Sequence, residues 1–376
     1  MRTQVGIVGA GPAGLTLARL LERAGIETVV LESRTREYCE RRIRAGVLEQ
    51  RTADLLRELG VGERMDREGI VHHGIHLQFD GERHHVPLSE LADGRTIVIY
   101  GQTEVVKDLI AARLASGLPL HFECGVESVD PELGIIRYAG GELECDLIAG
   151  CDGFHGVCRD SIPAGVLRTF EREYPFGWLG ILAGVAPSMD ELVYAHHERG
   201  FALLSLRSPL LSRYYLQVGH DEDVGEWPDE RVWEELRIRT ALDGWTLHEG
   251  PILEKGVTGM RSFVAEPMQC GRLYLAGDAA HIVPPTGAKG LNLAIADVRV
   301  LADGIVDGGL EHYSQRCLRR VWRAEQFSYW MTTMLHRLPD DDPFDLQLQL
   351  SQLRYTTTSY AAARSLAENY VGLETV

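Results

Sequence analysis

Two polar side chains, Ser205 and Arg207, interrupt an apolar stretch in the middle of the chain. Alternate residues of a β-strand face the same side, so these two side chains are predicted to lie together. A partly buried guanidinium requires an anion, and an adjacent hydroxyl completes a fork that fits a carboxylate. Tyr215, in the next predicted strand, would add a phenolic donor. By itself the pattern is typical of either a carboxylate-binding site or an internal salt bridge.

A glycine-rich turn follows the first apolar run, and Gly9, Gly11 and Gly14 in it have GxGxxG spacing. A helical pattern comes next, and the second apolar run ends at Glu32. In this context Gly9 permits a tight turn, Gly11 lets the backbone approach a pyrophosphate, and Gly14 lets helix and strand pack closely. The N–H groups of the first helical turn would bind the pyrophosphate, and Glu32 would accept hydrogen bonds from a ribose. We therefore expect a dinucleotide-binding unit.

Two later segments favour FAD over NAD as the dinucleotide. An apolar strand pattern ends at Asp152, and a second one delivers Asp278 at its carboxyl end. Strand ends of an open α/β sheet converge on the ligand crevice, and an aspartate so far along the chain suits a long ligand with a sugar-like chain, such as the ribitol of FAD. A helical pattern beginning near Gly290 would aim its N-terminus at the flavin ring and favour the negative charge of reduced flavin.

The order of the elements predicts an α/β fold: a Rossmann-like FAD-binding domain with an inserted, mostly β substrate domain and a helical C-terminal region. Asp80-Gly81 between two strand patterns is a strong hairpin signal. Further strands are expected at 178–185, 191–196, 201–207 and 213–218, before a helix at 229–241. The expected boundaries give the FAD-binding domain residues 1–72, 97–173 and 263–300, the substrate domain 73–96 and 174–262, and the helical region 301–376.

Composition excludes several classes of protein. The 376 residues carry a formal net charge of −17, so neither nucleic acid nor an anionic membrane is an expected partner. No apolar run approaches the ~18–20 residues of a membrane span, and no signal-peptide core precedes the first strand. The seven cysteines are odd in number and never spaced as CxxC, which is typical of reduced thiols in the cytoplasm.

Taken together, these segments resemble the FAD-dependent aromatic hydroxylases, the single-component flavoprotein monooxygenases, and among them most closely those acting on 4-hydroxybenzoate. The resemblance covers nearly the whole chain and is carried by the stretches 42–50, 100–104, 150–156, 174–180, 277–292 and 368–373. It implies an oxidoreductase with tightly but non-covalently bound FAD that uses O2 and NADH or NADPH. The implied reaction, part of aromatic catabolism, converts 4-hydroxybenzoate to 3,4-dihydroxybenzoate through a C4a-hydroperoxyflavin. A cytoplasmic homodimer is the implied state.

The resemblance also implies roles for the substrate-site residues. Ser205, Arg207 and Tyr215 match the site for the substrate carboxylate, and Tyr194 matches the tyrosine that holds the phenolic oxygen. The other implied residues are the proton-relay partner Tyr370, the solvent end of that relay His72, and Pro285, whose carbonyl lies beside the substrate hydroxyl. Electrophilic hydroxylation favours a phenolate over a phenol, so a hydrogen-bond chain that removes the proton activates the ring. Without the resemblance, each tyrosine is more typical of a core aromatic.

Cofactor contacts follow from the motifs and the resemblance together. The residues expected to bind FAD are Gly9, Gly11, Gly14, Glu32, Arg42, Arg44, Gln102, Asp152, Asp278, Gly290, Leu291 and Asn292. Those expected to meet NAD(P)H are Ser33, Arg34, Tyr38, Arg42, Arg44, His155, Arg159 and Arg261. Arg213 matches an arginine that supports the flavin environment. The chain has only three lysines against many arginines, so a solvated surface arginine is the competing interpretation for the nicotinamide group.

The residues after Glu32 bear on the choice between NADH and NADPH, and the spacing of the histidines bears on whether the chain binds a metal ion. NADPH-preferring relatives carry a basic residue where this chain has Ser33, and Glu37 and Glu40 would oppose a 2′-phosphate, so NADH or dual use is favoured. His72 and His76 have helical ligand spacing but lead into a strand, and the adjacent pairs 84–85 and 196–197 point to opposite strand faces. No metal site is expected.

Four alternatives remain open at this stage. A hydroxylase of a related hydroxybenzoic acid would use the same site. A flavin halogenase is disfavoured because the chain has neither a Trp-x-Trp-x-Ile-Pro segment nor a lysine where such enzymes hold a reactive one. A plain NAD dehydrogenase would be colourless rather than yellow. A non-catalytic flavin-fold binding protein would leave Ser205, Arg207 and Tyr370 without a task.

Overall fold

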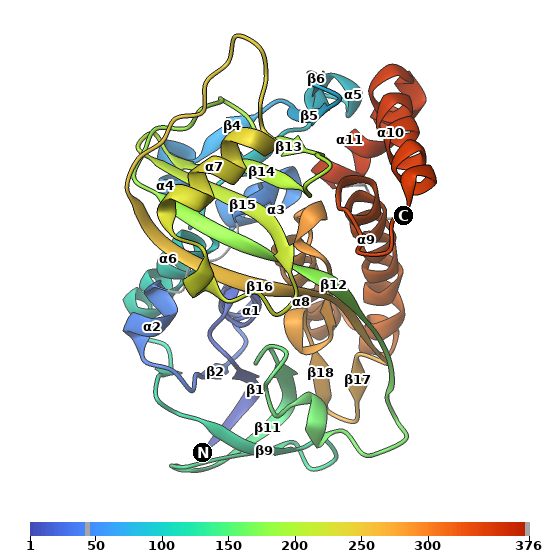
Figure 1. The fold of residues 1–376 in the computed structure, drawn as a ribbon. Coiled ribbons are helices and arrows are strands. Elements are labelled where there is room, and N and C mark those ends of the chain that lie inside the picture. The colour runs from blue at the N-terminus through green and yellow to red at the C-terminus, as the bar shows by residue number, and fades with distance from the viewer. Residues whose placement is uncertain (42–45, 373–376) are drawn as a thin grey trace.

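The computed structural model describes residues 1–41 and 46–372, which form two large sheets, a small sheet and a helical C-terminal region (Figure 1). The first sheet has a parallel core, because its apolar strands are covered by helices and joined by crossovers. Its order is β17 (Gln269–Cys270), β18 (Leu273–Leu275), β11 (Gly141–Gly150), β1 (Arg2–Val8), β2 (Thr28–Leu31) and β8 (Leu120–His121), with β9 (Val126–Asp130) and β10 (Ile135–Tyr138) attached beside β11.

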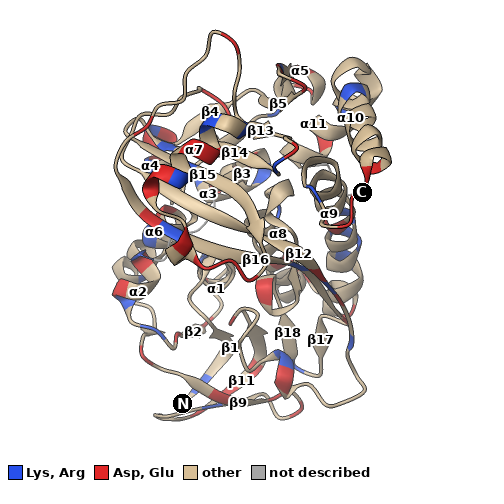
Figure 2. Ribbon diagram, viewed as in Figure 1, with Lys and Arg blue, Asp and Glu red and all other residues tan. Residues whose placement is uncertain are grey.

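Helices pack on this sheet through apolar faces. Helix α1 (Pro12–Arg23) lies between α6 (Gln102–Ala115) and α8 (Gly290–Asp307). Its buried side includes Leu15, Leu17 and Leu21, which join the core of the first sheet. Three shorter helices come after β2 along the chain: α2 (Arg36–Arg41), α3 (Gln50–Glu58) and α4 (Glu63–Glu68). Ion pairs join α4 to α6, where Arg64 contacts Glu104 and Asp108, and Figure 2 shows basic and acidic segments together along both helices.

The second sheet is mostly antiparallel, and its strands β13, β14 and β15 contain the residues expected to bind the substrate. Its order is β19 (His281–Ile282), β16 (Ile252–Glu266), β12 (Arg168–Ala183), β15 (Leu211–Gly219), β14 (Ala202–Ser208), β13 (Val193–Ala195), β5 (Ile75–Phe79) and β6 (Glu82–Val86). The expected hairpin is confirmed: Asp80 and Gly81 have φ of 51° and 73°, as a tight turn with two left-handed residues requires. Helix α7 (Asp229–Arg239) packs through Trp233 on the far side, against Tyr214 of β15.

The two longest strands pass from the region of the first sheet into the second (Figure 1). β12 and β16 pair along most of their lengths, from Arg168 opposite Glu266 to Ala183 opposite Ile252. The expected domain boundaries at 173/174 and 262/263 lie inside these two strands rather than between elements.

The remaining elements surround the site. A small sheet joins β3 (Val47–Glu49), β7 (Ile97–Ile99) and β4 (Ile70–His72), and α5 (Leu88–Leu91) precedes β7. The C-terminal region is helical, as expected: α9 (Tyr313–Leu335), α10 (Pro343–Thr358) and α11 (Tyr360–Val371). Short 3-10 turns lie at η1 (Arg159–Ser161), η2 (Val224–Glu226), η3 (Gly277–Ala279), η4 (Pro285–Gly287) and η5 (Leu310–His312). Among the described residues, no helix combines the length and apolar character needed to cross a lipid bilayer.

Candidate functional site

The glycine turn joins β1 to α1 with no room for side chains at two of its three glycines. Gly9 has φ of 102°, and a Cβ there would lie 2.4 Å from the carbonyl oxygen of Cys151. A Cβ on Gly14 would lie 2.0 Å from the carbonyl oxygen of Gly9. Around Gly11 there is open space instead, and no side chain caps the N-terminus of α1. The turn therefore leaves backbone N–H groups accessible where a pyrophosphate would bind.

Glu32 ends β2 beside this turn, with its carboxylate held by the backbone. Its Oε2 accepts from the N–H of Ala10 at 2.8 Å and its Oε1 from the N–H of Arg34 at 2.8 Å. The residue is 9% exposed. These two bonds fix the carboxylate at the carboxyl end of the parallel strand, where a ribose would pass.

Asp152 and Asp278 follow the neighbouring strands β11 and β18. Asp152 Oδ2 accepts from the N–H of Cys158 at 2.9 Å, while its buried Oδ1 has no partner in the described chain. Burial raises the pKa of this carboxyl. Asp278 is exposed on η3. A buried acceptor without a donor at the strand ends fits a ligand hydroxyl, as the ribitol of FAD would supply.

The N-terminus of α8 is also uncapped by side chains, and Gly290 faces open space. Asn292, one turn in, is buried and joins the helix to β3: it donates to the carbonyl of Val47 at 3.0 Å and accepts from the N–H of Glu49 at 2.9 Å. Leu291 is partly buried beside it.

The open glycines, the two helix N-termini without side-chain caps and the buried Asp152 oxygen without a partner together fit FAD. Gln102 begins α6, and Arg42 and Arg44 lie outside the described residues.

One face of the second sheet brings the expected substrate residues together. Tyr194 in β13 pairs with Leu203 in β14, and Leu203 pairs with Tyr215 in β15. Ser205 and Arg207 follow Leu203 at alternate positions, so all these side chains share one face. An Arg207 Nη donates to the Tyr215 hydroxyl at 3.5 Å, and Ser205 is 6% exposed.

Arg207 is half-buried and makes polar contacts with the strands around it. Its other Nη donates to the carbonyl of Leu206 at 3.2 Å. Burial lowers the pKa of its guanidinium, and Tyr215 opposes that shift. Arg213 lies opposite Ser205 in the register, 3.8 Å from Glu254, with its guanidinium 5.3 Å from the ring of Tyr215. Two arginines and two hydroxyl groups therefore surround one part of the face.

At the other end of the face, two tyrosines meet from distant parts of the chain. The hydroxyl groups of Tyr194 and Tyr370 lie 2.5 Å apart, and the two residues are 2% and 1% exposed. Burial raises the pKa of both phenols, so both are neutral near pH 7. A neutral hydroxyl pair can pass a proton, because each member both donates and accepts.

Lys289, to which the sequence analysis gave no role, lies against Tyr370 and pairs with Glu49. Lys289 donates to Glu49 at 2.6 Å and to the carbonyl of Tyr370 at 3.0 Å. Its Nζ is 5.8 Å from the centre of the Tyr370 ring. A lysine in a chain with so few of them, within the glycine-rich stretch before α8, was the available signal. The sequence analysis also gave no role to Trp178, which lies on the same face: it donates to His336 at 2.7 Å, and its ring stacks on Phe201.

His72 and Pro285, the other two residues expected to act on the substrate hydroxyl, form no described hydrogen bond with Tyr194 or Tyr370. His72 is fully buried in β4, and neither ring nitrogen has a hydrogen-bond partner within residues 1–41 and 46–372. Burial lowers its pKa to about 4. The structure therefore does not join His72 to Tyr370 by a direct hydrogen bond. Pro285 opens η4, where its carbonyl accepts from the N–H of Ala288 at 2.9 Å.

The expected nicotinamide residues fall into two separate groups. Arg159 and Arg261 converge on Phe154, with guanidinium carbons 4.7 and 4.8 Å from its ring centre, and His155 packs edge-on against the same ring. Ser33, Arg34 and Tyr38 are exposed around α2, where Arg34 lies 5.1 Å over the Tyr38 ring.

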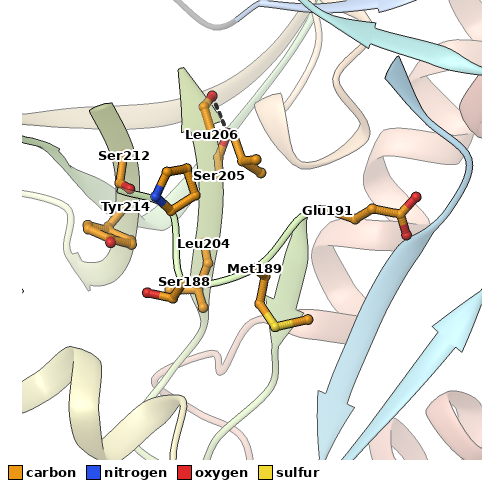
Figure 3. Close-up of a pocket in the computed structure, with 9 residues that line it drawn as sticks. Ser188, Met189, Glu191, Leu204, Ser205, Leu206, Ser212 and Tyr214 are labelled. Carbon is orange, nitrogen blue, oxygen red and sulfur yellow. Dashed lines mark hydrogen bonds between the residues drawn. The ribbon is translucent and has the colours of Figure 1, made fainter. Parts of the chain in front are cut away.

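A small cavity lies on the opposite side of the substrate face (Figure 3). Leu204, Leu206, Ser212 and Tyr214 line it from β14 and β15, and Ser205 lines it as well. In Figure 3 the Glu191 carboxylate points away from the other lining side chains.

Comparison with known proteins agrees with this geometry. The family model described as FAD binding domain matches residues 2–328. The chain thus belongs to the family of FAD-dependent aromatic hydroxylases, and it is a flavoprotein monooxygenase. Within that class it is 48% identical to the p-hydroxybenzoate hydroxylase of Acinetobacter baylyi, over 99% of this chain and 96% of that protein.

More distant relatives share the same architecture. A 3-amino-4-hydroxybenzoate 2-monooxygenase of Streptomyces platensis, PtnB3, is 27% identical over 90% of both chains. The crystal structure of the p-nitrophenol 4-monooxygenase PnpA of Pseudomonas putida superposes with a TM-score of 0.84 at 20% identity and full coverage of both chains, which shows the common fold. The predicted fold class and the FAD requirement are confirmed.

Proposed function

We propose that this enzyme hydroxylates 4-hydroxybenzoate at the 3-position, giving 3,4-dihydroxybenzoate with O2 and NADH or NADPH. The observation that carries the proposal is the shared sheet face, which has a half-buried cation at Arg207 and a buried tyrosine pair, Tyr194 and Tyr370. Tyr194 lies opposite Leu203, and Ser205 is two residues further, or about 7 Å along the strand. That spacing suits a ring with a carboxylate at one end and a hydroxyl at the other.

Arg207, Ser205 and Tyr215 would hold the carboxylate of the substrate. A guanidinium binds a carboxylate with two parallel hydrogen bonds, and such charge-assisted bonds are stronger inside a protein than in water. The two hydroxyl groups would fill the remaining acceptor positions. This contact would fix the plane of the ring.

Tyr194 would accept the substrate's phenolic proton and pass it to Tyr370. Removal of that proton raises electron density on the ring carbon beside the oxygen, which is where hydroxylation occurs. The carbonyl of Pro285 would lie beside the same hydroxyl. His72 would complete the route to solvent through intervening water, because its neutral imidazole can both accept and donate a proton.

Bound FAD would accept electrons from NADH or NADPH and use them to activate O2. The pyrophosphate of FAD would be bound by Gly9, Gly11 and Gly14 together with Gln102, Arg42 and Arg44. Glu32 would hold the adenosine ribose. Asp152 and Asp278 would hold the ribitol chain. The start of α8, at Gly290, Leu291 and Asn292, would stabilise negative charge on the flavin.

NAD(P)H would contact two regions of the protein. One is the surface around Phe154, with His155, Arg159 and Arg261, and the other is α2. NADH or dual use is favoured, because the arginines of α2 have acidic partners: Arg36 pairs with Glu40 at 2.6 Å and Arg41 with Glu37 at 2.8 Å. A 2′-phosphate would have to compete with those carboxylates. A large kinetic preference for NADPH would contradict this part of the proposal.

A homodimer in the cytoplasm is the proposed state. Helices α10 and α11 lie side by side and expose Phe344, Leu348, Tyr355 and Tyr360. Exposed aromatic side chains on adjacent helices are typical of a subunit interface. The buried thiols of Cys145, Cys151, Cys158 and Cys317 fit a reducing compartment.

The test is NADH and NADPH oxidation by the yellow holoenzyme with and without 4-hydroxybenzoate, with dihydroxylated product measured against hydrogen peroxide. Substrate-stimulated oxidation with product close to stoichiometric supports the proposal. Stimulation with peroxide alone indicates that a related hydroxybenzoic acid is the true substrate. Absence of stimulated oxidation indicates a flavin-binding protein without turnover.

A further inference from the structure

Three side chains able to bind a metal ion meet at the edge of the second sheet. They are His76 in β5, His85 in β6 and Glu191 just before β13, and their ligand atoms all lie within 4.8 Å of one another. The hairpin register places His76 directly opposite His85, with ring centres 4.9 Å apart. We propose that His76, His85 and Glu191 form a binding site for a divalent transition-metal cation of the zinc type, apart from the substrate face.

Glu191 is already oriented as a ligand. Its Oε1 accepts from the backbone N–H groups of His73 at 2.8 Å and Gly74 at 2.6 Å. Its Oε2 is left facing the histidines, 2.9 Å from His85 Nε2 and 4.0 Å from His76 Nε2. A carboxylate fixed through one oxygen presents the other with little loss of conformational freedom, as the outer contacts of metal ligands do.

Both imidazoles have space for a metal ion beside them. The buried Nδ1 of His76 has no hydrogen-bond partner within the described residues. The His85 side chain is 45% exposed, which opens the site to solvent. A Cβ on Gly74 would lie 2.1 Å from His85 Nε2, so the glycine leaves the space that this ring occupies.

The donor set selects the kind of cation. Two imidazole nitrogens and one carboxylate oxygen, with water in the fourth position, are ligands that Zn²⁺ prefers, and Ni²⁺ and Cu²⁺ accept them as well. Tetrahedral bonds of ~2.0–2.2 Å place ligand atoms ~3.3–3.6 Å apart, so side-chain rotation must close the present spread by about 1 Å. Arg83 repels a cation here, although its guanidinium is held by Gln78 and by the Trp245 ring at 4.3 Å. Because the ligands must move and Arg83 repels the cation, we expect a dissociation constant in the micromolar rather than the nanomolar range.

A bound cation would join two parts of the substrate domain. Glu191 precedes Tyr194 by three residues, and β13 pairs with β5 through Val193 opposite His76. The metal would therefore cross-link the β5–β6 hairpin to the strand that carries Tyr194. The sequence analysis expected no metal because it compared histidines that are neighbours along the chain, whereas the pair forms across the hairpin.

The experiment is calorimetric titration of chelator-treated, FAD-loaded enzyme with ZnCl2, together with its melting temperature with and without zinc. The wild type is expected to bind one equivalent with a micromolar Kd and to melt at a higher temperature when loaded. His85→Gln and Glu191→Gln should each weaken binding at least about tenfold. His84→Gln is the matched control and should stay within about twofold, because the His84 ring stacks on Phe79 at 4.6 Å on the other face of the hairpin.

Two results would overturn the inference: no saturable binding below about 0.1 mM in the wild type, or equal affinities in His84→Gln and His85→Gln. Circular dichroism and flavin content check that each variant folds. If His85→Gln does not fold, electron paramagnetic resonance of one Cu²⁺ equivalent on the wild type decides. Coupling to two imidazole nitrogens supports the site, and coupling to fewer contradicts it.

Discussion

The hydroxyl groups of Tyr194 and Tyr370 form a buried hydrogen bond of 2.5 Å, although 176 residues separate them in the chain. Strand β13 of the second sheet supplies one tyrosine and the C-terminal helix α11 supplies the other. Because both phenols are buried and neutral, the pair can carry a proton away from a bound hydroxyl without holding a charge itself. The proposed relay therefore depends on how the C-terminal region packs against the second sheet.

Replacing Tyr194 by Phe tests that relay. Tyr194→Phe keeps the ring and removes the hydroxyl, so coupled hydroxylation of 4-hydroxybenzoate at neutral pH should fall by roughly 100-fold or more. Product formation against peroxide measures the loss. Tyr214→Phe is the control: Tyr214 lies on the far side of the sheet, where its hydroxyl donates to the carbonyl of His248 at 3.3 Å, and activity should be retained. Full coupled activity in Tyr194→Phe would reject the relay.

Replacing Arg207 tests the carboxylate contact. Arg207→Lys keeps a charge but loses the two-pronged geometry, and the loss of hydrogen bonds to a charged group, about 1.5–3 kcal/mol, should raise KM for 4-hydroxybenzoate about 10–100-fold. Steady-state kinetics with 4-hydroxybenzoate and with phenol gives the readout, because the preference for the acid should shrink in the variant. Arg137→Lys, an exposed pair with Glu142 at 2.8 Å, is the control. An unchanged preference would show that the carboxylate binds elsewhere.

Local patterns in the sequence were sufficient for part of this architecture. Strand alternation alone predicts that Ser205 and Arg207 share a face, and spacing alone predicts the turn at Gly9 and Gly14, because both features depend on residues close in the chain. The hairpin at Asp80 is equally local.

Contacts made by tertiary packing were beyond such patterns. The pairing of Tyr194 with Tyr370 could be expected only through resemblance to a known family. Lys289 with Glu49 was not expected, since no periodicity relates residues of different segments. His76 opposite His85 follows from the register of the predicted hairpin, but its contact with Glu191 depends on tertiary packing. The lengths of β12 and β16 were missed for the same reason: their pairing with each other extends them across the expected domain boundaries.

The glycine turn gives a prediction that separates folding from cofactor binding. Gly14→Ala places a Cβ against the carbonyl oxygen of Gly9, so stability should fall by about 1–3 kcal/mol or more. Gly11→Val places its side chain in open space at a φ of −77°, which valine adopts, so the flavin-free protein should melt as the wild type does. FAD should nevertheless be lost from Gly11→Val, because the side chain fills the pyrophosphate position. The absorbance ratio of flavin to protein and the melting temperature measure the two effects, and full flavin content in Gly11→Val would contradict the placement.

The stability of the protein should fall as the pH decreases from about 6.5 to 4. Burial lowers the pKa of His336 to about 3 and that of His72 to about 4, because neither imidazolium would be hydrated. Unfolding restores the ordinary value of about 6.5, so in this window the unfolded chain binds more protons and is favoured, whereas above pH 6.5 the two states bind equally.

His336→Gln tests this dependence, since glutamine can still accept the Trp178 N–H that His336 accepts at 2.7 Å. Urea unfolding midpoints between pH 4.5 and 7.5 should vary less with pH in this variant than in the wild type. The exposed His312 is the matched control, and His312→Gln should keep the wild-type slope. Equal slopes in His336→Gln and the wild type would show that the buried imidazole at position 336 does not contribute to the acid sensitivity.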